Sequence, residues 1–162
     1  MKIGIVADSH DNIPAIKKTV EYFNKRNIDI VIHAGDYVAP FSVKEFLRLK
    51  AKLIGVFGNN DGEKQGINNL HKEIYDAPHL FNIDGKKFLV AHSLENLNPQ
   101  LEKDADIIIF AHTHEPRIRK TRKNGKIYIN PGECGGWLNG KSTIAILDTE
   151  TCVAEIIDLS TF

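Results

Sequence analysis

The chain has 162 residues, and its 21 Lys and Arg balance 21 Asp and Glu, so the formal net charge is zero. This balance gives no electrostatic reason to expect strong binding to duplex nucleic acid or to an anionic membrane. Hydrophobic residues make up 42% and charged residues 26%, which is usual for a soluble globular protein. The length predicts one domain, residues 1–162, with a core of its own.

The sequence gives no signal for a membrane or for an oxidising compartment. It contains no apolar run long enough for a membrane span, and its first residues reach Asp8 too early for a signal-peptide core. We therefore expect a cytoplasmic protein. The two cysteines, Cys134 and Cys152, are too few for a disulfide framework and lack paired zinc spacing, so we expect both to be reduced and to pack.

The first part of the chain alternates hydrophobic strands with helices. The pattern predicts strands at 2–7, 28–34 and 52–57, and helices at 13–26, 41–49 and 63–72. Asp11 or Asn12 can cap the first helix, and Phe41 and Phe46 are expected to face the core from the second. A β-α-β-α-β order predicts a parallel sheet with right-handed crossovers.

The remainder of the chain is dominated by hairpins. Strands are predicted at 80–83, 87–91, 107–111, 117–122, 126–129, 143–147 and 153–158, with a helix at 94–103. Asp84-Gly85 and Asn124-Gly125 are typical hairpin turns. We predict an α/β fold in which two mixed β-sheets pack face to face with helices outside.

Side chains that can bind metal follow five of the predicted strands. There are seven of them: Asp8, His10, Asp36, Asn59, His92, His112 and His114. Ligands bind at the carboxyl ends of strands in open α/β sheets, so five loops can converge on one cavity. Asp8 and His10 are two residues apart, as are His112 and His114, and such residues share a face when the backbone is extended.

The donors are imidazole nitrogens and carboxylate or amide oxygens. This set suits Mn²⁺, which we favour, and also Fe²⁺, Co²⁺, Ni²⁺ or Zn²⁺. The donors suffice for two divalent ions that share a carboxylate, and Asp36 is the expected bridge. Paired ions about 3.5–4 Å apart are a common device for cleaving phosphate esters. His33 lies inside a predicted strand and is expected to pack.

The motif order resembles that of the calcineurin-like metallophosphoesterase superfamily. The resemblance rests on Asp8-x-His10, Gly35-Asp36, Gly58-Asn59-x-Asp61, His92 and Ala111-His112-x-His114. The short chain is similar to the small bacterial and archaeal phosphodiesterase subgroup. The resemblance implies a four-layer α-β-β-α sandwich and two metal sites. One ion would be held by Asp8, His10, Asp36 and His114, and the other by Asp36, Asn59, His92 and His112.

One position departs from the family pattern. The usual Gly-Asn-His-Asp is Gly58-Asn59-Asn60-Asp61 here, so Asn60 replaces a histidine that contacts phosphate and helps to protonate the leaving group. An amide donates a hydrogen bond but supplies no proton, and general acid catalysis contributes roughly 10²–10⁴-fold. We expect Asn60 to position a phosphate oxygen, and good leaving groups to be favoured.

These residues predict a metal-dependent phosphodiesterase in which a hydroxide bridging two ions attacks a small phosphodiester or nucleotide-like substrate. A phosphomonoesterase or nuclease of the same fold is an alternative. Two further alternatives are a non-catalytic interaction module, like the retromer subunit with this fold, and a metal site with a purely structural role. The sequence is also compatible with a homo-oligomer.

Two further features have open interpretations. Trp137 follows a glycine-rich segment. It either lines the site and contacts a base or an aryl group of the substrate, or it belongs to a structural turn. The basic hairpin, with Arg117, Arg119, Lys120, Arg122, Lys123 and Lys126, is expected to be a solvated sheet edge.

Overall fold

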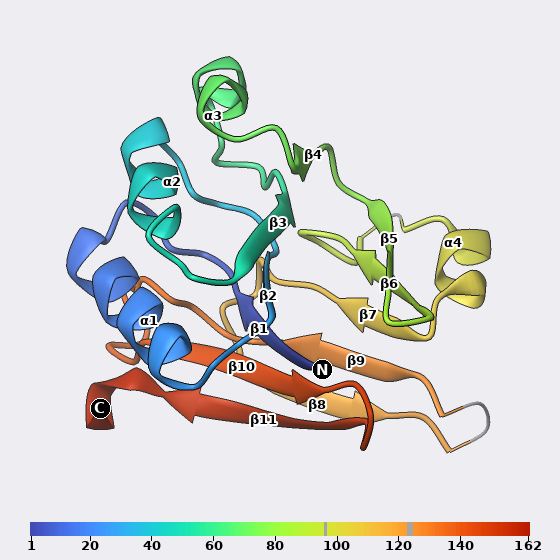
Figure 1. Cartoon of the computed structure of the whole chain (residues 1–162). Coiled ribbons are helices and arrows are strands. Elements are labelled where there is room, and N and C mark those ends of the chain that lie inside the picture. The colour runs from blue at the N-terminus through green and yellow to red at the C-terminus, as the bar shows by residue number, and fades with distance from the viewer. Residues whose placement is uncertain (96, 123–124) are drawn as a thin grey trace.

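Two β-sheets occupy the centre of the molecule in the computed structural model, which describes residues 1–95, 97–122 and 125–162 (Figure 1). The first sheet has the order β11-β10-β1-β2-β3-β4, formed by Val153–Asp158, Thr143–Asp148, Lys2–Val6, Ile30–His33, Lys52–Val56 and Ile74–Tyr75. The second has the order β5-β6-β7-β9-β8, formed by His79–Ile83, Lys86–Val90, Ile107–Ile109, Ile127–Asn130 and Arg117–Lys120.

Both sheets are mixed, as predicted. In the first, β1, β2, β3 and β4 pair in parallel, whereas β10 runs antiparallel to both β1 and β11. In the second, β6, β7 and β9 pair in parallel, and β5 and β8 run antiparallel to their neighbours. Parallel pairing gathers the carboxyl ends of β1 to β3 at one edge and those of β6, β7 and β9 at another.

Helices form the two outer layers. They are α1 (Ile13–Lys25), α2 (Pro40–Phe46), α3 (Lys64–Leu70) and α4 (Pro99–Asp104), with a 3₁₀ turn at Leu159–Thr161. In Figure 1, α1 and α2 lie beside the first sheet and α4 lies beside the second. The predicted four-layer α-β-β-α sandwich is therefore confirmed. Asn12 caps α1, since its side chain accepts a hydrogen bond from the Ala15 amide.

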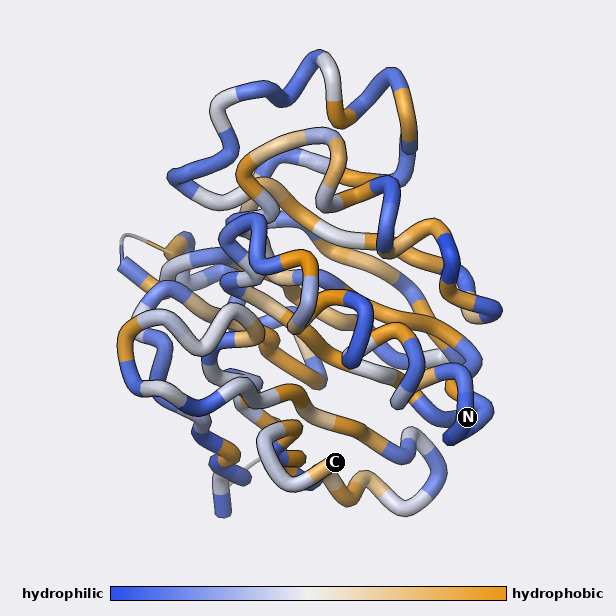
Figure 2. Tube along the Cα trace, turned by 90° about the vertical axis from the view of Figure 1, so that its left-hand side faces the viewer, coloured by the Kyte–Doolittle hydropathy of each residue, from blue (hydrophilic) through white to orange (hydrophobic). Residues whose placement is uncertain are grey.

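The hydrophobic core follows these layers. One cluster fills the space between the sheets and includes Ile5, Val90 and Ile109. A second packs the two N-terminal helices against the first sheet, and a third, smaller one places Leu101 of α4 against the second sheet. Figure 2 shows the same arrangement, with hydrophobic strands inside and hydrophilic segments at the periphery. Within the described ranges no helix could span a lipid bilayer.

Several sequence expectations need correction. The helix predicted at 94–103 begins only at Pro99, because the Asn98 side chain caps it by accepting from the Gln100 amide. Phe41 is 51% exposed, since it lies in the first turn of α2, while Phe46 is buried as expected. The short edge strand β4 was not predicted. Residue 96 of the predicted helix, and the turn and basic residues at 123–124, lie outside the described part of the chain.

Both cysteines are free, in agreement with the sequence. Cys134 is fully buried, and its Sγ lies 3.3 Å from the Thr19 hydroxyl. His33 also packs as expected: it is fully buried and stacks on Tyr37 with ring centroids 3.7 Å apart. A hydrogen bond from the Gly35 amide to His33 Nδ1 leaves Nε2 to face the Ser9 hydroxyl.

Candidate metal centre

The loops after β1, β2 and β6 bring three buried donors together. Asp8 follows β1, Asp36 follows β2 and His92 follows β6, and their exposed fractions are 0%, 1% and 5%. Nε2 of His92 lies 3.3 Å from Oδ2 of Asp36 and 4.0 Å from Oδ1 of Asp8. Two donors about 2.1 Å from one ion are separated by about 3–4 Å, so this spacing suits a shared ion.

A second group of donors adjoins the first. Nε2 of His10 and Nε2 of His114 lie 3.8 and 3.7 Å from the same Asp8 Oδ1 atom. The His10 and His114 rings stack at 24°, with centroids 5.2 Å apart. His10 also lies 3.7 Å from Oδ2 of Asp36. The two groups, Asp8-His10-His114 and Asp8-Asp36-His92, therefore share Asp8.

The hydrogen bonding of these atoms fits a metal site. Asp8 Oδ1, His10 Nε2 and His92 Nε2 are buried and accept or donate no hydrogen bond among the described residues. Buried polar atoms without partners are rare and costly in folded proteins. A divalent cation would satisfy all three at once, because each presents a lone pair toward the same region when the carboxylate is ionised and the imidazoles are neutral.

The backbone of the ligand loops is not extended, contrary to the sequence argument. Asp8, His10, Asp36, His112 and His114 all have φ between 41° and 69°, in the left-handed region that non-glycine residues seldom occupy. Tight turns, rather than strand alternation, thus bring Asp8 and His10 together. Such conformations cluster at functional sites, where the surrounding structure enforces them.

Two glycines permit the close approach of the loops, as predicted. Gly35 has φ +101°, and a Cβ there would meet the Gly58 amide and His92 Nδ1, both at 2.7 Å. A Cβ on Gly58 would collide with the Asp36 carboxylate. The absence of a side chain at Gly35 and Gly58 therefore lets the loops after β2 and β3 approach each other closely.

Asp61 is a site residue to which the sequence analysis gave no role. Its carboxylate accepts hydrogen bonds from the amides of Asp36, Val38 and Gly58 at 3.0, 2.7 and 2.7 Å. It thereby fixes the loop that carries Asp36 to the loop that carries Asn59 and Asn60. Burial raises the pKa of Asp61, against the lowering effect of these amides.

Glu133 is a second residue that sequence reasoning missed. It is 1% exposed, and its Oε2 lies 3.4 Å from Nδ1 of His114. His92 has a comparable partner, since its Nδ1 lies 2.9 Å from the Ala34 carbonyl oxygen. The Ala34 carbonyl makes a hydrogen bond with His92 Nδ1, whereas the Glu133 carboxylate faces His114 Nδ1 as a close ion-pair contact. In both residues Nε2 is left toward the site, and partners of this kind commonly orient metal-binding histidines.

The ionisable groups are strongly perturbed. Burial raises the pKa of Asp8 to about 6, despite the opposing influence of His114 and His92. Burial also acts to raise the pKa of Asp36, but the closeness and charge of His92 and the hydrogen bonds donated by Asn60 outweigh it and lower that pKa. Burial lowers the pKa of His10. The pKa of His92 is raised, because the Asp36 carboxylate outweighs the effect of burial.

The other candidate residues border these groups. Asn59 and His112 are exposed. The His112 ring meets the His92 ring edge to face at 5.2 Å, and its backbone amide donates to Asp8 Oδ2 at 3.3 Å. Asn60 holds Asp36 directly: its amide side chain donates to Oδ2 at 2.7 Å and its backbone N–H to Oδ1 at 2.8 Å. The roles of Asn59 and His112 as metal ligands stay predictions, as does the role of Asn60 as a phosphate contact.

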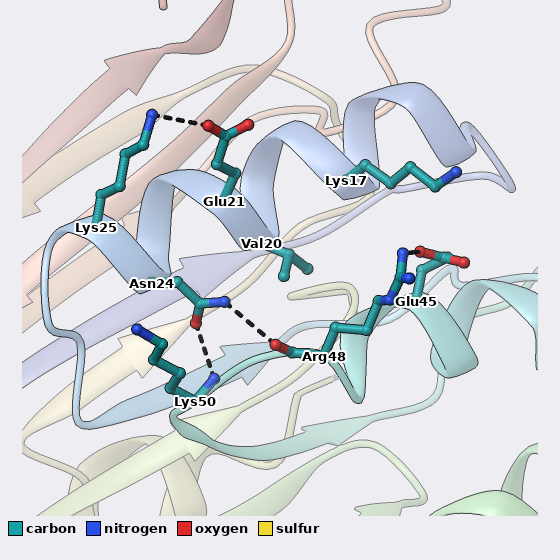
Figure 3. Close-up of a pocket in the computed structure, with 8 residues that line it drawn as sticks. All are labelled: Lys17, Val20, Glu21, Asn24, Lys25, Glu45, Arg48 and Lys50. Atoms are coloured by element: carbon teal, nitrogen blue, oxygen red, sulfur yellow. Dashed lines mark hydrogen bonds and ion pairs between the residues drawn. The ribbon is translucent and has the colours of Figure 1, made fainter.

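A large groove elsewhere on the surface is unrelated to these residues. It lies between α1 and α2, has a volume of about 490 Å³, and is drawn in Figure 3. Lys25 pairs with Glu21 and Arg48 with Glu45 along its walls. None of the seven predicted ligands lines this groove, so it does not contribute to the metal centre.

The basic hairpin is largely the solvated edge that the sequence suggested. All four residues of β8 are exposed, and β8 is an edge strand. Lys126 is an exception, because its ammonium donates to the carbonyl oxygens of Glu102, Lys103 and Ala105. It therefore caps the C-terminal end of α4 rather than facing solvent.

Comparison with known proteins places this arrangement in a family. The calcineurin-like phosphoesterase superfamily domain matches residues 1–152. The chain belongs to this superfamily. A phosphoesterase-superfamily relative from Methanocaldococcus jannaschii, named phosphodiesterase MJ0936, is 41% identical over 158 residues, which cover 93% of this chain and 94% of the relative. A probable metallophosphoesterase from Methanothermobacter thermautotrophicus is 29% identical over 82% of this chain and 76% of its own.

Solved structures of other proteins agree with the fold. An archaeal phosphodiesterase superposes with a TM-score of 0.84 at 38% identity, covering 98% of this chain and 99% of that chain. YfcE, a phosphoesterase from E. coli, has a TM-score of 0.77 at 21% identity, covering 99% and 94%. Vps29 from Entamoeba histolytica, solved with Zn²⁺, has a TM-score of 0.72 at 18% identity, covering 98% and 99%. Because YfcE and Vps29 are only 21% and 18% identical to this chain, the comparison with them shows a shared fold and says nothing about a shared function.

Proposed function

We propose that the protein is a metal-dependent phosphodiesterase with a dinuclear centre, acting on a small phosphodiester or nucleotide-like substrate. The observation that carries this proposal is the sharing of buried Asp8 by two groups of donors, Asp8-His10-His114 and Asp8-Asp36-His92. The relative from Methanocaldococcus jannaschii named as a phosphodiesterase, at 41% identity, supports the choice of diesters.

The proposed ligand set is the one expected from the sequence: Asp8, His10, Asp36, Asn59, His92, His112 and His114. Asp36 stays the proposed bridge, and Asp8 is a second carboxylate that reaches both groups. When bound, two divalent ions would lower the pKa of a water molecule, which is the source of the predicted bridging hydroxide, and would stabilise charge on phosphate. We favour Mn²⁺, because the donors are imidazoles and carboxylates without thiolates.

The protein's own residues perform the remaining tasks. Glu133 and the Ala34 carbonyl hold His114 and His92 with Nε2 toward the site. One N–H of the Asn60 side-chain amide donates to Asp36, and we propose that the second N–H orients a phosphate oxygen beside it. Since an amide supplies no proton, the leaving group must depart without a side-chain acid at position 60. Diesters with good leaving groups are therefore the proposed preferred substrates.

A substrate panel tests the proposal. Protein loaded with Mn²⁺, Ni²⁺, Co²⁺, Fe²⁺ or Zn²⁺ should hydrolyse bis(4-nitrophenyl) phosphate faster than 4-nitrophenyl phosphate or DNA, and Asp36→Ala should abolish turnover. Faster hydrolysis of the monoester or of DNA would favour the alternative phosphomonoesterase or nuclease. Absence of turnover with every ester and metal would instead favour an interaction module. The cytoplasmic location stays a prediction.

A further inference from the structure

The loop after β9 places an exposed aromatic ring beside the metal centre. Trp137 is 64% exposed, yet its indole N–H donates to the backbone carbonyl oxygen of His10 at 3.1 Å. His10 is one of the donors in the group formed with Asp8 and His114. The ring is therefore fixed to a ligand loop while much of its surface remains open to solvent.

A buried carboxylate holds this loop in place. Oε1 of Glu133 accepts the Trp137 backbone N–H at 2.7 Å, and Oε2 accepts that of Leu138 at 3.1 Å. The same Oε2 faces His114 at 3.4 Å. One side chain thus fixes both the indole-bearing loop and a metal-binding histidine, so the position of the ring is coupled to that of the site.

Neighbouring residues bring the indole close to the loop after β1. A Cβ at Gly135 would lie 2.9 Å from Trp137 Cδ1 and 3.1 Å from the carbonyl oxygens of Asp8 and Ser9. Only glycine leaves room for the ring and the ligand loop to approach in this way. Asn12 adds a further link, because its side-chain amide donates to the Gly135 carbonyl oxygen at 2.6 Å.

We propose that Trp137 is a stacking platform that selects phosphodiesters carrying an aromatic ester group, such as a nucleobase or an aryl ring. This inference rests on the proposed phosphodiesterase function and names the substrate class of that site. A tryptophan held by its own N–H loses little freedom when a ligand binds, so its open face is preorganised. Stacking on aromatic side chains tolerates different bases, because every base has a π-face.

The test compares two diesters that break the same bond. Bis(4-nitrophenyl) phosphate and methyl 4-nitrophenyl phosphate share a leaving group and differ only in the retained ester, which is aromatic in the first. We expect Trp137→Ala to reduce the kcat/KM preference for the aryl ester by about 5- to 100-fold, and Trp137→Phe to retain most of it. Leu138→Ala, on the same loop and 72% exposed, should keep the wild-type preference.

An unchanged preference in Trp137→Ala, or an equal loss in Leu138→Ala, would overturn the proposal. So would dissociation of an oligomer by Trp137→Ala without a change of preference, because the ring would then be a contact between copies of the chain. Using the ratio of two substrates removes any effect of the variants on metal affinity, which changes both rates alike.

A second measurement does not require turnover. The sequence contains one tryptophan, so intrinsic fluorescence reports on this ring specifically. Adenosine 5′-monophosphate should quench the fluorescence of the Mn²⁺-loaded protein at concentrations where ribose 5-phosphate does not. An equal response to both compounds would refute the platform. If neither diester is hydrolysed but the base-specific quench is present, the proposed activity fails and the stacking site stands.

Discussion

Oε2 of Glu133 lies 3.4 Å from Nδ1 of His114, and both groups are largely shielded from solvent. This contact orients the imidazole so that Nε2 faces Asp8, as carboxylate partners of metal-binding histidines commonly do. Glu133 has no counterpart among the residues that the motif pattern singled out. It also receives the backbone amides of Trp137 and Leu138, so its loss would affect the site and the neighbouring loop together.

Glu133→Gln should weaken Mn²⁺ binding by about 10- to 100-fold, because the neutral amide orients and polarises His114 less well. Isothermal titration calorimetry measures the change. Glu115→Gln is the matched control, since Glu115 directly follows His114 but is exposed, and it should bind Mn²⁺ like the wild type. Equal affinities for the two variants would show that the Glu133 contact does not support the ligand.

Gly58→Ala should disrupt the centre, because the added Cβ would collide with the Asp36 carboxylate. We expect a loss of about 1–3 kcal/mol in the free energy of unfolding, as for overpacked sites, together with weaker Mn²⁺ binding. Gly62→Ala serves as control, since a Cβ there meets nothing within 4 Å. Thermal unfolding with and without Mn²⁺ compares the two. A Gly58→Ala protein as stable as Gly62→Ala would contradict the close approach of the two loops.

Asn60→His should restore a proton donor. For diesters with poor leaving groups we expect kcat to rise, by up to roughly 10²-fold, and the pH–rate profile to gain a limb that falls as the imidazolium loses its proton. Asn60→Ala is the comparison, because it removes the amide without adding an acid and should gain no such limb. A profile of Asn60→His that matches the wild type would count against this account of position 60.

Mn²⁺ affinity should depend on pH near 6. Burial raises the pKa of the Asp8 carboxyl to about 6, and Asp36 raises that of His92. The metal-free folded protein therefore carries protons at the site below about pH 6, and a metal must displace them. Affinity should fall by up to about tenfold per pH unit for each proton displaced, and level off at higher pH once both groups have lost their protons. Calorimetric titrations from pH 5 to 8 check this, and a constant affinity across that range would contradict it.

The sequence predicted the layers better than the details of the site. Alternating hydrophobic strands and helices indicated two mixed sheets with helices outside, because periodicity directly reflects which face is buried. The predicted helix at 94–103 was too long, since the Asn98 cap and Pro99 set its start. The exposed position of Phe41 depends on where α2 begins, which hydrophobic spacing alone does not determine.

The donors that come together were also identified from the sequence: Asp8, His10, Asp36, His92 and His114. The left-handed turns that orient them could not be anticipated, because Asp8 and His10 lack the glycine that usually marks positive φ. Glu133 and Asp61 were missed for a different reason. Each acts on residues distant in the chain, and such contacts exist only once the loops have folded together. The available signals were the place of Asp61 in the Gly58-Asn59-x-Asp61 motif and that of Glu133 in the glycine-rich segment after β9.

Anomalous scattering from crystals grown with Mn²⁺ tests the central claim most directly. Two peaks about 3.5–4 Å apart should lie among the side chains of Asp8, His10, Asp36, His92 and His114, and the same crystals of Asp36→Ala should lose at least one of them. A single peak, or none between Asp8 and Asp36, would contradict a dinuclear centre in this protein.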